Sequence, residues 1–289
     1  MQNSIEYIFF LFFSYLVRIA GLRLARKFSS LLAFLFFYII PIRKQTVIEN
    51  LTFSFPDHSK EKIYDIAFRC YKSFSITLIE LLAIPWLNRS QMEAMVECSN
   101  PELITKRYNQ NKGVILLSAH FGNWEYIALS VSLQINIPFS VVVKPQRNPY
   151  VTKWLEEART KWINKIIPSG LSIRQVYKEL LDKKVVAMVA DQRGPREGIK
   201  LDFMGRPAMF FSGPAMLSLK TGAPLLFGIP VRQPDYSYKA EMFEVSRENL
   251  PESEEEKIIE LTRRQKEYLE KFIREYPDQW FWMHKRWKY

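Results

Sequence analysis

The chain has 289 residues, of which 48% are hydrophobic, 15% aromatic and 25% charged. This much apolar surface can offset the entropy of an ordered chain, which excludes intrinsic disorder, and the share of charged residues excludes a polytopic membrane protein. The 41 lysines and arginines exceed the 30 acidic residues and give a net charge of +11. That charge favours an anionic partner, such as nucleic acid, a phosphorylated ligand or a membrane surface.

Two apolar runs, residues 7–17 and 28–42, lie close to the N-terminus. A helix over the longer run would be about 22 Å long, short of the roughly 30 Å hydrocarbon core of a bilayer. Basic residues separate the runs, a pattern typical of a helix in the lipid headgroup layer: Arg18, Arg23, Arg26 and Lys27. We expect residues 1–42 to anchor the chain, as an uncleaved span or an interfacial hairpin. A helical pair packed on the globular domain is the alternative.

The remainder, residues 43–289, is expected to form one α/β domain. A first helix is expected over residues 59–83, where apolar residues recur at helical spacing. Short apolar segments then alternate with helical ones. The expected strands are residues 114–118, 139–143, 185–190, 225–231 and 238–245, and the expected helices are residues 124–133, 149–165, 172–183, 212–221 and 253–275. This alternation predicts a mostly parallel central sheet flanked by helices.

Polar residues come directly after three of these strands. His120 follows the strand at 114–118, Lys144 follows the strand at 139–143, and Asp191 follows the strand at 185–190. Ligands of open α/β sheets bind beyond the carboxyl ends of the strands. We therefore expect these side chains to converge on one crevice.

His120 stands before a Gly-Asn turn, and Glu125 opens the helix that follows. If the chain folds back across this turn, it brings a carboxylate to the imidazole, and such a pair acts as a general base toward a hydroxyl. The helix start near Asn123 also offers free N–H groups to a developing oxyanion. A structural histidine bonded to the backbone is the alternative that position alone leaves open.

Several other chemistries lack their sequence patterns. The chain contains no H-E-x-x-H or C-x-x-C pattern, so no metal site is expected, and no G-x-S-x-G motif or glycine-rich phosphate loop. Helix-turn-helix, zinc-finger and RNP patterns are also missing, which together with the apolar N-terminus argues against a nucleic-acid partner.

The segment Ser118–Glu125 (SAHFGNWE) matches the H-x-x-x-x-D/E motif of glycerolipid-type acyltransferases. Around it, the chain resembles the bacterial late lipid A acyltransferase family. Further matches follow in order, namely Glu49-Asn50-Leu51 leading to Phe55-Pro56, then Asp191-Gln192, residues 211–224, and residues 279–288. The resemblance covers essentially the whole chain, and this ordered set is far more specific than the short motif.

The resemblance implies an αβα sandwich in an enzyme of the bacterial inner membrane, with its active site on the cytoplasmic side. It implies transfer of a fatty acyl chain from acyl carrier protein to a hydroxyl of a lipid A precursor, without a metal or an organic cofactor. In this role His120 takes the proton of the acceptor hydroxyl, and Glu125 orients and charge-balances the imidazole.

Four residues are expected to bind substrate: Lys144, Asp191, Arg193 and Arg286. The family usually has arginine where Lys144 stands, and lysine lacks the bidentate fork of a guanidinium. Arg193 opens a basic segment suited to lipid phosphates, or alternatively a solvated loop. Arg286 lies in a tryptophan-rich stretch typical of a headgroup region or of packed core. For Asp191, a plain loop carboxylate is the alternative.

Other functions also remain open at this point. One is the same reaction on another glycolipid, such as a phosphoinositol mannoside, or with acyl-CoA as the donor. The other, from a different class, is a membrane lipid-binding protein without activity. A catalytic base at His120 distinguishes these two classes.

Overall fold

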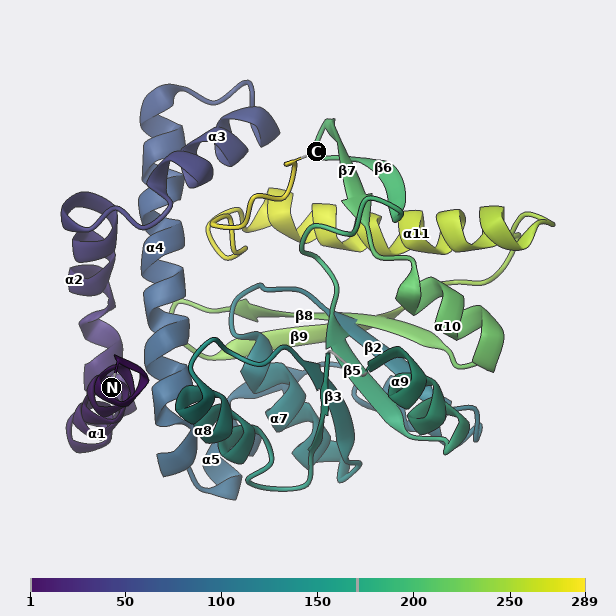
Figure 1. Cartoon of the computed structure of the whole chain (residues 1–289), viewed down its shortest axis with the longest axis horizontal. Coiled ribbons are helices and arrows are strands. Elements are labelled where there is room, and N and C mark those ends of the chain that lie inside the picture. Colours follow the sequence, from purple (N-terminus) through teal and green to yellow (C-terminus); the bar gives the residue numbers. More distant parts are fainter. Residues whose placement is uncertain (1, 170–171, 289) are drawn as a thin grey trace.

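The computed structural model describes residues 2–169 and 172–288, and its centre is a seven-stranded sheet of order β1-β9-β8-β2-β5-β3-β4 (Figure 1). The strands of this sheet are β1 (Val96–Cys98), β2 (Val114–Ser118), β3 (Phe139–Val143), β4 (Lys165–Pro168), β5 (Val185–Val189), β8 (Leu225–Arg232) and β9 (Tyr238–Glu244). Within the described chain, β8 and β9 are its one antiparallel pair. The prediction of a mostly parallel sheet is therefore confirmed.

Helices cover both faces of the sheet. They are α1 (Gln2–Lys27), α2 (Ser29–Phe34), the π-helix η1 (Leu35–Ile39), α3 (Lys44–Ser54), α4 (Lys60–Ala83), the 3₁₀ turn η2 (Ile84–Trp86), α5 (Arg89–Glu93), α6 (Glu102–Tyr108), α7 (Trp124–Ile135), α8 (Pro149–Arg159), α9 (Ser172–Leu181), α10 (Gly213–Thr221) and α11 (Glu254–Glu275). In Figure 1, α10 and α11 lie on one side of the sheet and α5, α7 and α8 on the other. A separate hairpin, β6 (Ile199–Phe203) and β7 (Arg206–Phe210), stands beside α11.

The sequences of the central strands are mostly apolar and suit their buried positions. Every residue of β8 is buried, and β2 is buried up to its last residue. The expected helix over residues 149–165 is too long, since α8 ends at Arg159 and β4 begins at Lys165. Asn164 fixes this change of direction. Its side chain accepts a hydrogen bond from the Phe139 backbone N–H and donates one to the Ala128 carbonyl.

The N-terminal helices pack on the long helix α4 (Figure 1) with one face and expose the other. Val17, Ala25, Ala33 and Phe37 are buried, whereas the opposite face presents large exposed apolar side chains, among them Ile8, Phe9, Phe12, Phe13, Ile19, Leu31, Phe34 and Ile39. The inner face therefore agrees with the alternative that these helices pack on the globular domain. The outer face is suited to contact with lipid.

The first apolar run, residues 7–17, is too short to span a bilayer by itself, but it is part of the longer helix α1. Helical residues on both sides extend it, and the part Gln2–Ala20 is long and apolar enough to cross a membrane by length and composition. The second segment, Leu22–Ile39, passes the same test only together with Lys44–Ser54, across a bend of 96°.

The headgroup-layer prediction requires all four basic residues between the runs to face outward, and this is not what the structure shows. Arg26 is buried and forms an ion pair of 2.6 Å with the fully buried carboxylate of Glu80 on α4. The guanidinium of Arg18 lies over the ring of Trp86, 4.5 Å from its centroid. Arg23 and Lys27 are exposed. Because a buried carboxylate needs a counter-charge, Arg26 is held inside the protein.

Candidate active site

His120 and Asp191 meet at the carboxyl edge of the sheet. The strands that precede them, β2 and β5, are parallel neighbours, so the residues beyond their ends lie side by side. The imidazole Nδ1 of His120 is 2.7 Å from Oδ1 of Asp191. The backbone N–H of His120 donates to Oδ2 of the same carboxylate at 3.0 Å, and the indole N–H of Trp280 donates to it at 2.8 Å. The predicted convergence is thus confirmed for this pair.

The surroundings of the pair control the charge of the imidazole. Burial lowers the pKa of His120, but the charge and the hydrogen bond of Asp191, aided by the charge of Glu125, outweigh it, so the pKa lies above its usual value. For Asp191, burial raises the pKa, and His120 and Trp280 more than offset this, so its pKa lies below the usual value. The lowered pKa keeps Asp191 ionised, and the raised pKa makes the imidazole of His120 a better proton acceptor.

Glu125 does not take the position expected for it. In the described part of the chain its carboxylate pairs with the guanidinium of Arg159, at 2.6 and 2.8 Å, and Asp191 makes the contact with His120 in its place. Glu125 lies in the first turn of α7, and this turn directs its side chain toward α8, where Arg159 is the last residue. Its effect on His120 is therefore one of charge without a direct hydrogen bond.

The first turn of α7 is also less open than expected. The side-chain oxygen of Asn123 accepts hydrogen bonds from the N–H groups of Glu125 at 3.2 Å and Tyr126 at 3.1 Å. These are the bonds of an ordinary helix N-cap. The two N–H groups are thus occupied, and the prediction that they serve an oxyanion is wrong for them.

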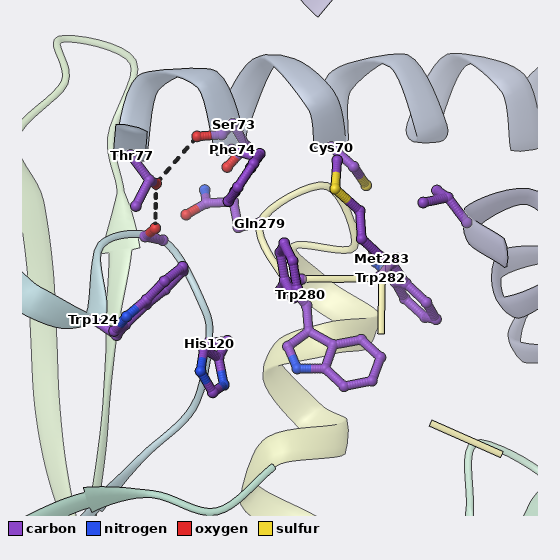
Figure 2. A pocket seen from close by; sticks show the side chains of 13 residues that line it. Cys70, Ser73, Phe74, Thr77, His120, Trp124, Gln279, Trp280, Trp282 and Met283 are labelled. Carbon is purple, nitrogen blue, oxygen red and sulfur yellow. Dashed lines mark hydrogen bonds between the residues drawn. The ribbon is translucent and has the colours of Figure 1, made fainter. Parts of the chain in front are cut away.

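A mainly apolar hollow opens beside His120, between α4 and the C-terminal segment (Figure 2). In Figure 2, Cys70, Ser73, Phe74 and Thr77 extend from α4, and His120 and Trp124 lie at the sheet end of the hollow. Its lining comprises Val47, Cys70, Ser73, Phe74, Thr77, His120, Gly122, Trp124, Gln279, Trp280, Phe281, Trp282 and Met283. The imidazole of His120 thus lines a small hollow whose other walls are mainly apolar.

The C-terminal segment holds the turn that begins at His120 in place, a role that sequence reasoning did not assign to it. The backbone N–H of Phe281 donates to the His120 carbonyl, and that of Gly122 donates to the Gln279 carbonyl, both at 2.9 Å. Phe121 and Trp280 form an isolated β-bridge. The Trp280 indole completes these contacts at Asp191. The sequence predicts only headgroup contacts or packed core for the tryptophans of this stretch.

The remaining predicted site residues lie in different surroundings. Lys144 is exposed directly after β3, at the same sheet edge as His120, and Arg193 is partly exposed two residues after Asp191. Arg286 is only 1% exposed, and its guanidinium lies over the ring of Phe210 at 4.2 Å and donates to the Met209 carbonyl at 2.6 Å. Burial lowers the pKa of Arg286 to about 10. These contacts match the packed-core alternative for Arg286.

Metal-binding side chains do not gather in the described part of the chain, where no group of three or more His, Cys, Asp or Glu could hold a metal ion.

The buried arginine at the end of β8, Arg232, is a further residue that the sequence analysis missed. It lies at the same sheet edge and donates to Ser73, Thr77 and Tyr238.

A histidine–carboxylate pair at the carboxyl edge of an α/β sheet, beside a hollow lined mainly by apolar side chains, is an arrangement typical of enzymes. Comparison with known proteins identifies the kind of enzyme. Residues 2–289 match the family described as bacterial lipid A biosynthesis acyltransferase. The chain belongs to this family and is an acyltransferase, which excludes the alternative of a binding protein without activity.

Individual relatives agree with the family match. The lipid A biosynthesis palmitoleoyltransferase of Escherichia coli (strain K12) is 23% identical over 248 residues, covering 85% of this chain and 79% of that protein. The lipid A biosynthesis lauroyltransferase of the same organism is 26% identical over 249 residues, with the same coverage. A phosphatidylinositol mannoside acyltransferase of Mycolicibacterium smegmatis is 21% identical over 150 residues, covering 50% of this chain and 49% of that protein.

Proposed function

We propose that this enzyme transfers a fatty acyl chain from the thioester of acyl carrier protein to a hydroxyl of a lipid A precursor. The observation that carries the proposal is the His120–Asp191 pair at the end of an apolar hollow, in a chain whose relatives include lipid A acyltransferases. The imidazole supplies the base, and the apolar side chains beside it offer contacts to the hydrocarbon part of a substrate.

The reaction follows from the orientation of the imidazole. Asp191 binds Nδ1, so the neutral ring carries its proton there, and Nε2, which lies 3.5 Å from the side-chain nitrogen of Gln192, is the nitrogen that accepts another. Nε2 takes the proton of the acceptor hydroxyl, whose oxygen attacks the thioester carbonyl. When the tetrahedral intermediate collapses, the carbon–sulfur bond breaks and the imidazolium returns its proton to the leaving thiolate. Asp191 stabilises the imidazolium that forms between these steps.

The other predicted residues act around this centre. Glu125 balances the charge of His120 without contacting it, and its ion pair with Arg159 fixes its position. Lys144 and Arg193, on the exposed side, contact phosphate groups of the glycolipid. Arg286 supports the site by holding the β6–β7 hairpin against the C-terminal segment.

Residues 1–42 anchor the enzyme to the bacterial inner membrane, and residues 43–289 form the acyltransferase domain on the cytoplasmic side. The exposed apolar face of α1 and α2 supports this arrangement, as does the spanning length of Gln2–Ala20. The acyl chain then enters the site from the membrane side.

Lipid analysis tests the acceptor. Mass spectrometry of lipid A from a strain lacking the gene should show the loss of one secondary acyl chain, restored by the wild-type gene and not by a His120→Ala gene. Unchanged lipid A would contradict the proposal. Loss of acylation on a phosphoinositol mannoside instead would favour the second acceptor, to which the mycobacterial relative points.

The donor is tested separately, because acyl carrier protein and acyl-CoA present the same thioester. Purified enzyme is given one fatty acid on each carrier, with a lipid A precursor bearing Kdo sugars as the acceptor. We expect transfer from acyl carrier protein at much lower donor concentration. Equal or better use of acyl-CoA would overturn the assignment of the donor.

A further inference from the structure

Glu80 is a fully buried carboxylate, 0% exposed, at the point where four elements meet. One oxygen of its side chain binds the guanidinium of Arg26 on α1, at 2.6 Å. The other accepts hydrogen bonds from the Asn123 amide at 2.8 Å and from the Tyr238 hydroxyl at 2.5 Å. Its backbone carbonyl accepts from the Tyr126 hydroxyl at 3.0 Å. A carboxylate so far from water persists only when charge partners and hydrogen bonds surround it in this way.

The contact with Asn123 connects Glu80 to the catalytic turn. The Asn123 side chain uses its amide nitrogen for Glu80 and its oxygen for the cap of α7. Glu80 thereby fixes the residue that ends the turn beginning at His120. It holds this residue in the orientation that also places Glu125 near Arg159.

A second contact from the same helix holds the middle of the turn. Thr77, nearly one helical turn before Glu80, donates a hydrogen bond of 2.6 Å to the Gly122 carbonyl, drawn as a dashed line in Figure 2. Arg232 donates to Thr77 at 2.7 Å, and its guanidinium is 3.9 Å from the Glu80 carboxylate. One face of α4 therefore positions both residues that follow Phe121.

The principal counter-charge of Glu80 comes from the N-terminal segment. Arg26 lies near the end of α1, beyond the kink at Gly21, and its side chain crosses to α4. Removing one partner of a buried ion pair leaves the other charge uncompensated, which costs far more than removing both. The geometry of the turn at His120 is thus connected to whether this part of α1 is docked.

We propose that Glu80 is a positioning residue for His120, and that Arg26 makes the docking of the N-terminal helix on α4 a condition for an ordered catalytic turn. The inference rests on the proposed function, since it takes His120 as the base. It extends the role of residues 1–42 from attachment to the membrane to support of the active site.

The test compares four variants in the full-length protein: Arg26→Lys, Arg26→Met, Glu80→Gln and the double variant Arg26→Met/Glu80→Gln. Activity is measured with lauroyl-acyl carrier protein and a Kdo-bearing lipid A precursor in detergent. We expect Arg26→Met to lower kcat about tenfold or more with a smaller change in KM, because the turn is displaced while the binding surfaces remain. Arg26→Lys keeps the charge, and the double variant removes both charges, so each should recover much of the loss.

A second readout observes His120 without relying on turnover. The chain has three histidines, so NMR of ¹³C-labelled histidine resolves the imidazole of His120, assigned by its loss in His120→Ala. We expect its resonance to shift in Arg26→Met and to return toward the wild-type position in the double variant. This measurement remains informative if the assay substrate is wrong, so failure of the proposed function and failure of this inference are distinguishable.

Arg69→Met is the control, because Arg69 also pairs with a carboxylate, that of Asp65, but on the exposed side of α4. It should leave both readouts unchanged. If Arg26→Met does not fold, Asn123→Ser replaces it, since serine keeps the helix cap and loses the bond to Glu80. That variant should shift the His120 resonance, and its circular dichroism spectrum should show that it is folded. Wild-type kcat and an unshifted His120 resonance in the folded Arg26 or Asn123 variants would overturn the inference.

Discussion

At the scale of single residues, Asp191 makes the contacts that orient the imidazole of His120. It accepts three hydrogen bonds, from the imidazole and the backbone N–H of His120 and from the indole of Trp280. Its carboxylate is almost completely buried. Two substitutions separate its role from that of Glu125.

Asp191→Asn should lower the maximal rate about a hundredfold or more, because the amide no longer stabilises the imidazolium or fixes its tautomer. The pH profile gives the sign. His120 must be neutral to act, and Asp191 raises its pKa, so wild-type kcat/KM falls as the pH drops through this raised value. Without the carboxylate, burial dominates and the pKa of His120 falls. The acidic limb of kcat/KM should therefore move to lower pH, and an unchanged limb would contradict the pairing.

Glu125→Gln should have the weaker effect of the two. Glu125 raises the pKa of His120 by its charge, and its hydrogen bonds go to Arg159. The acidic limb should again move to lower pH, but by less than in Asp191→Asn. Measurement of kcat/KM between about pH 5 and 9 checks the order of the two variants. A larger shift in Glu125→Gln would restore Glu125 as the principal partner of His120.

At the scale of elements, the turn between β2 and α7 is clamped from three directions. Helix α4 contacts it through Thr77, the C-terminal segment through Gln279 and Phe281, and β8 lies directly beside Gly122. Gly122 has a φ of +51°, a left-handed conformation that favours glycine, and a Cβ at this position would overlap the Pro230 carbonyl oxygen.

Gly122→Ala should therefore displace the turn and lower activity at least about tenfold, with a loss of about 1–3 kcal/mol in the free energy of unfolding. Gly213→Ala is the control, because a methyl group at Gly213 meets no atom within 4 Å. Assays and denaturant unfolding of both variants check the prediction. Wild-type activity in Gly122→Ala would show that the turn does not need its observed conformation.

At the scale of the whole molecule, the apolar surface lies mainly on the N-terminal helices, at the left of Figure 1, whereas α9 lies away from them, right of the centre. Ile8, Phe12 and Ile19 fall on one outward face of α1 and are each more than half exposed. A surface of this kind binds lipid through buried apolar area.

Replacing Ile8, Phe12 and Ile19 by aspartate should reduce binding to anionic phospholipid vesicles about tenfold or more, since charged groups do not enter the hydrocarbon layer. The control places three aspartates at Ile173, Tyr177 and Leu181, exposed apolar residues of α9. Both variants change the net charge equally, and vesicle flotation compares them. Equal binding by the two would refute the assignment of the membrane surface.

The elements that could be predicted from the sequence are those whose pattern is local. The buried strands β2, β3, β5 and β8 are continuous apolar runs, and their positions were predicted to within a residue or two. The short edge strands β1 and β4 lack such a run, and β4 pairs with β3 alone. Edge strands need less apolar sequence because one side faces away from the sheet.

The site is predictable only in part, because most of its contacts join residues that are far apart in the sequence. His120 and Asp191 were identified as residues at strand ends, but their contact joins positions 71 residues apart and depends on the strand order. Glu125 was paired with His120 because it is near in sequence, and Arg159 takes it away by a contact across two helices. A glutamate in the apolar end of α4, Glu80, was the one available signal of the buried network.

The central claim is that His120 is the base in acyl transfer to a glycolipid hydroxyl. The most direct test is the first turnover of purified enzyme with acyl carrier protein carrying a labelled fatty acid and a Kdo-bearing lipid A precursor, with the product followed by mass spectrometry. We predict a precursor heavier by one acyl group, formed by His120→Ala about 10²–10⁴ times more slowly than by the wild type, with the fold unchanged. Transfer by His120→Ala at the wild-type rate would contradict the account.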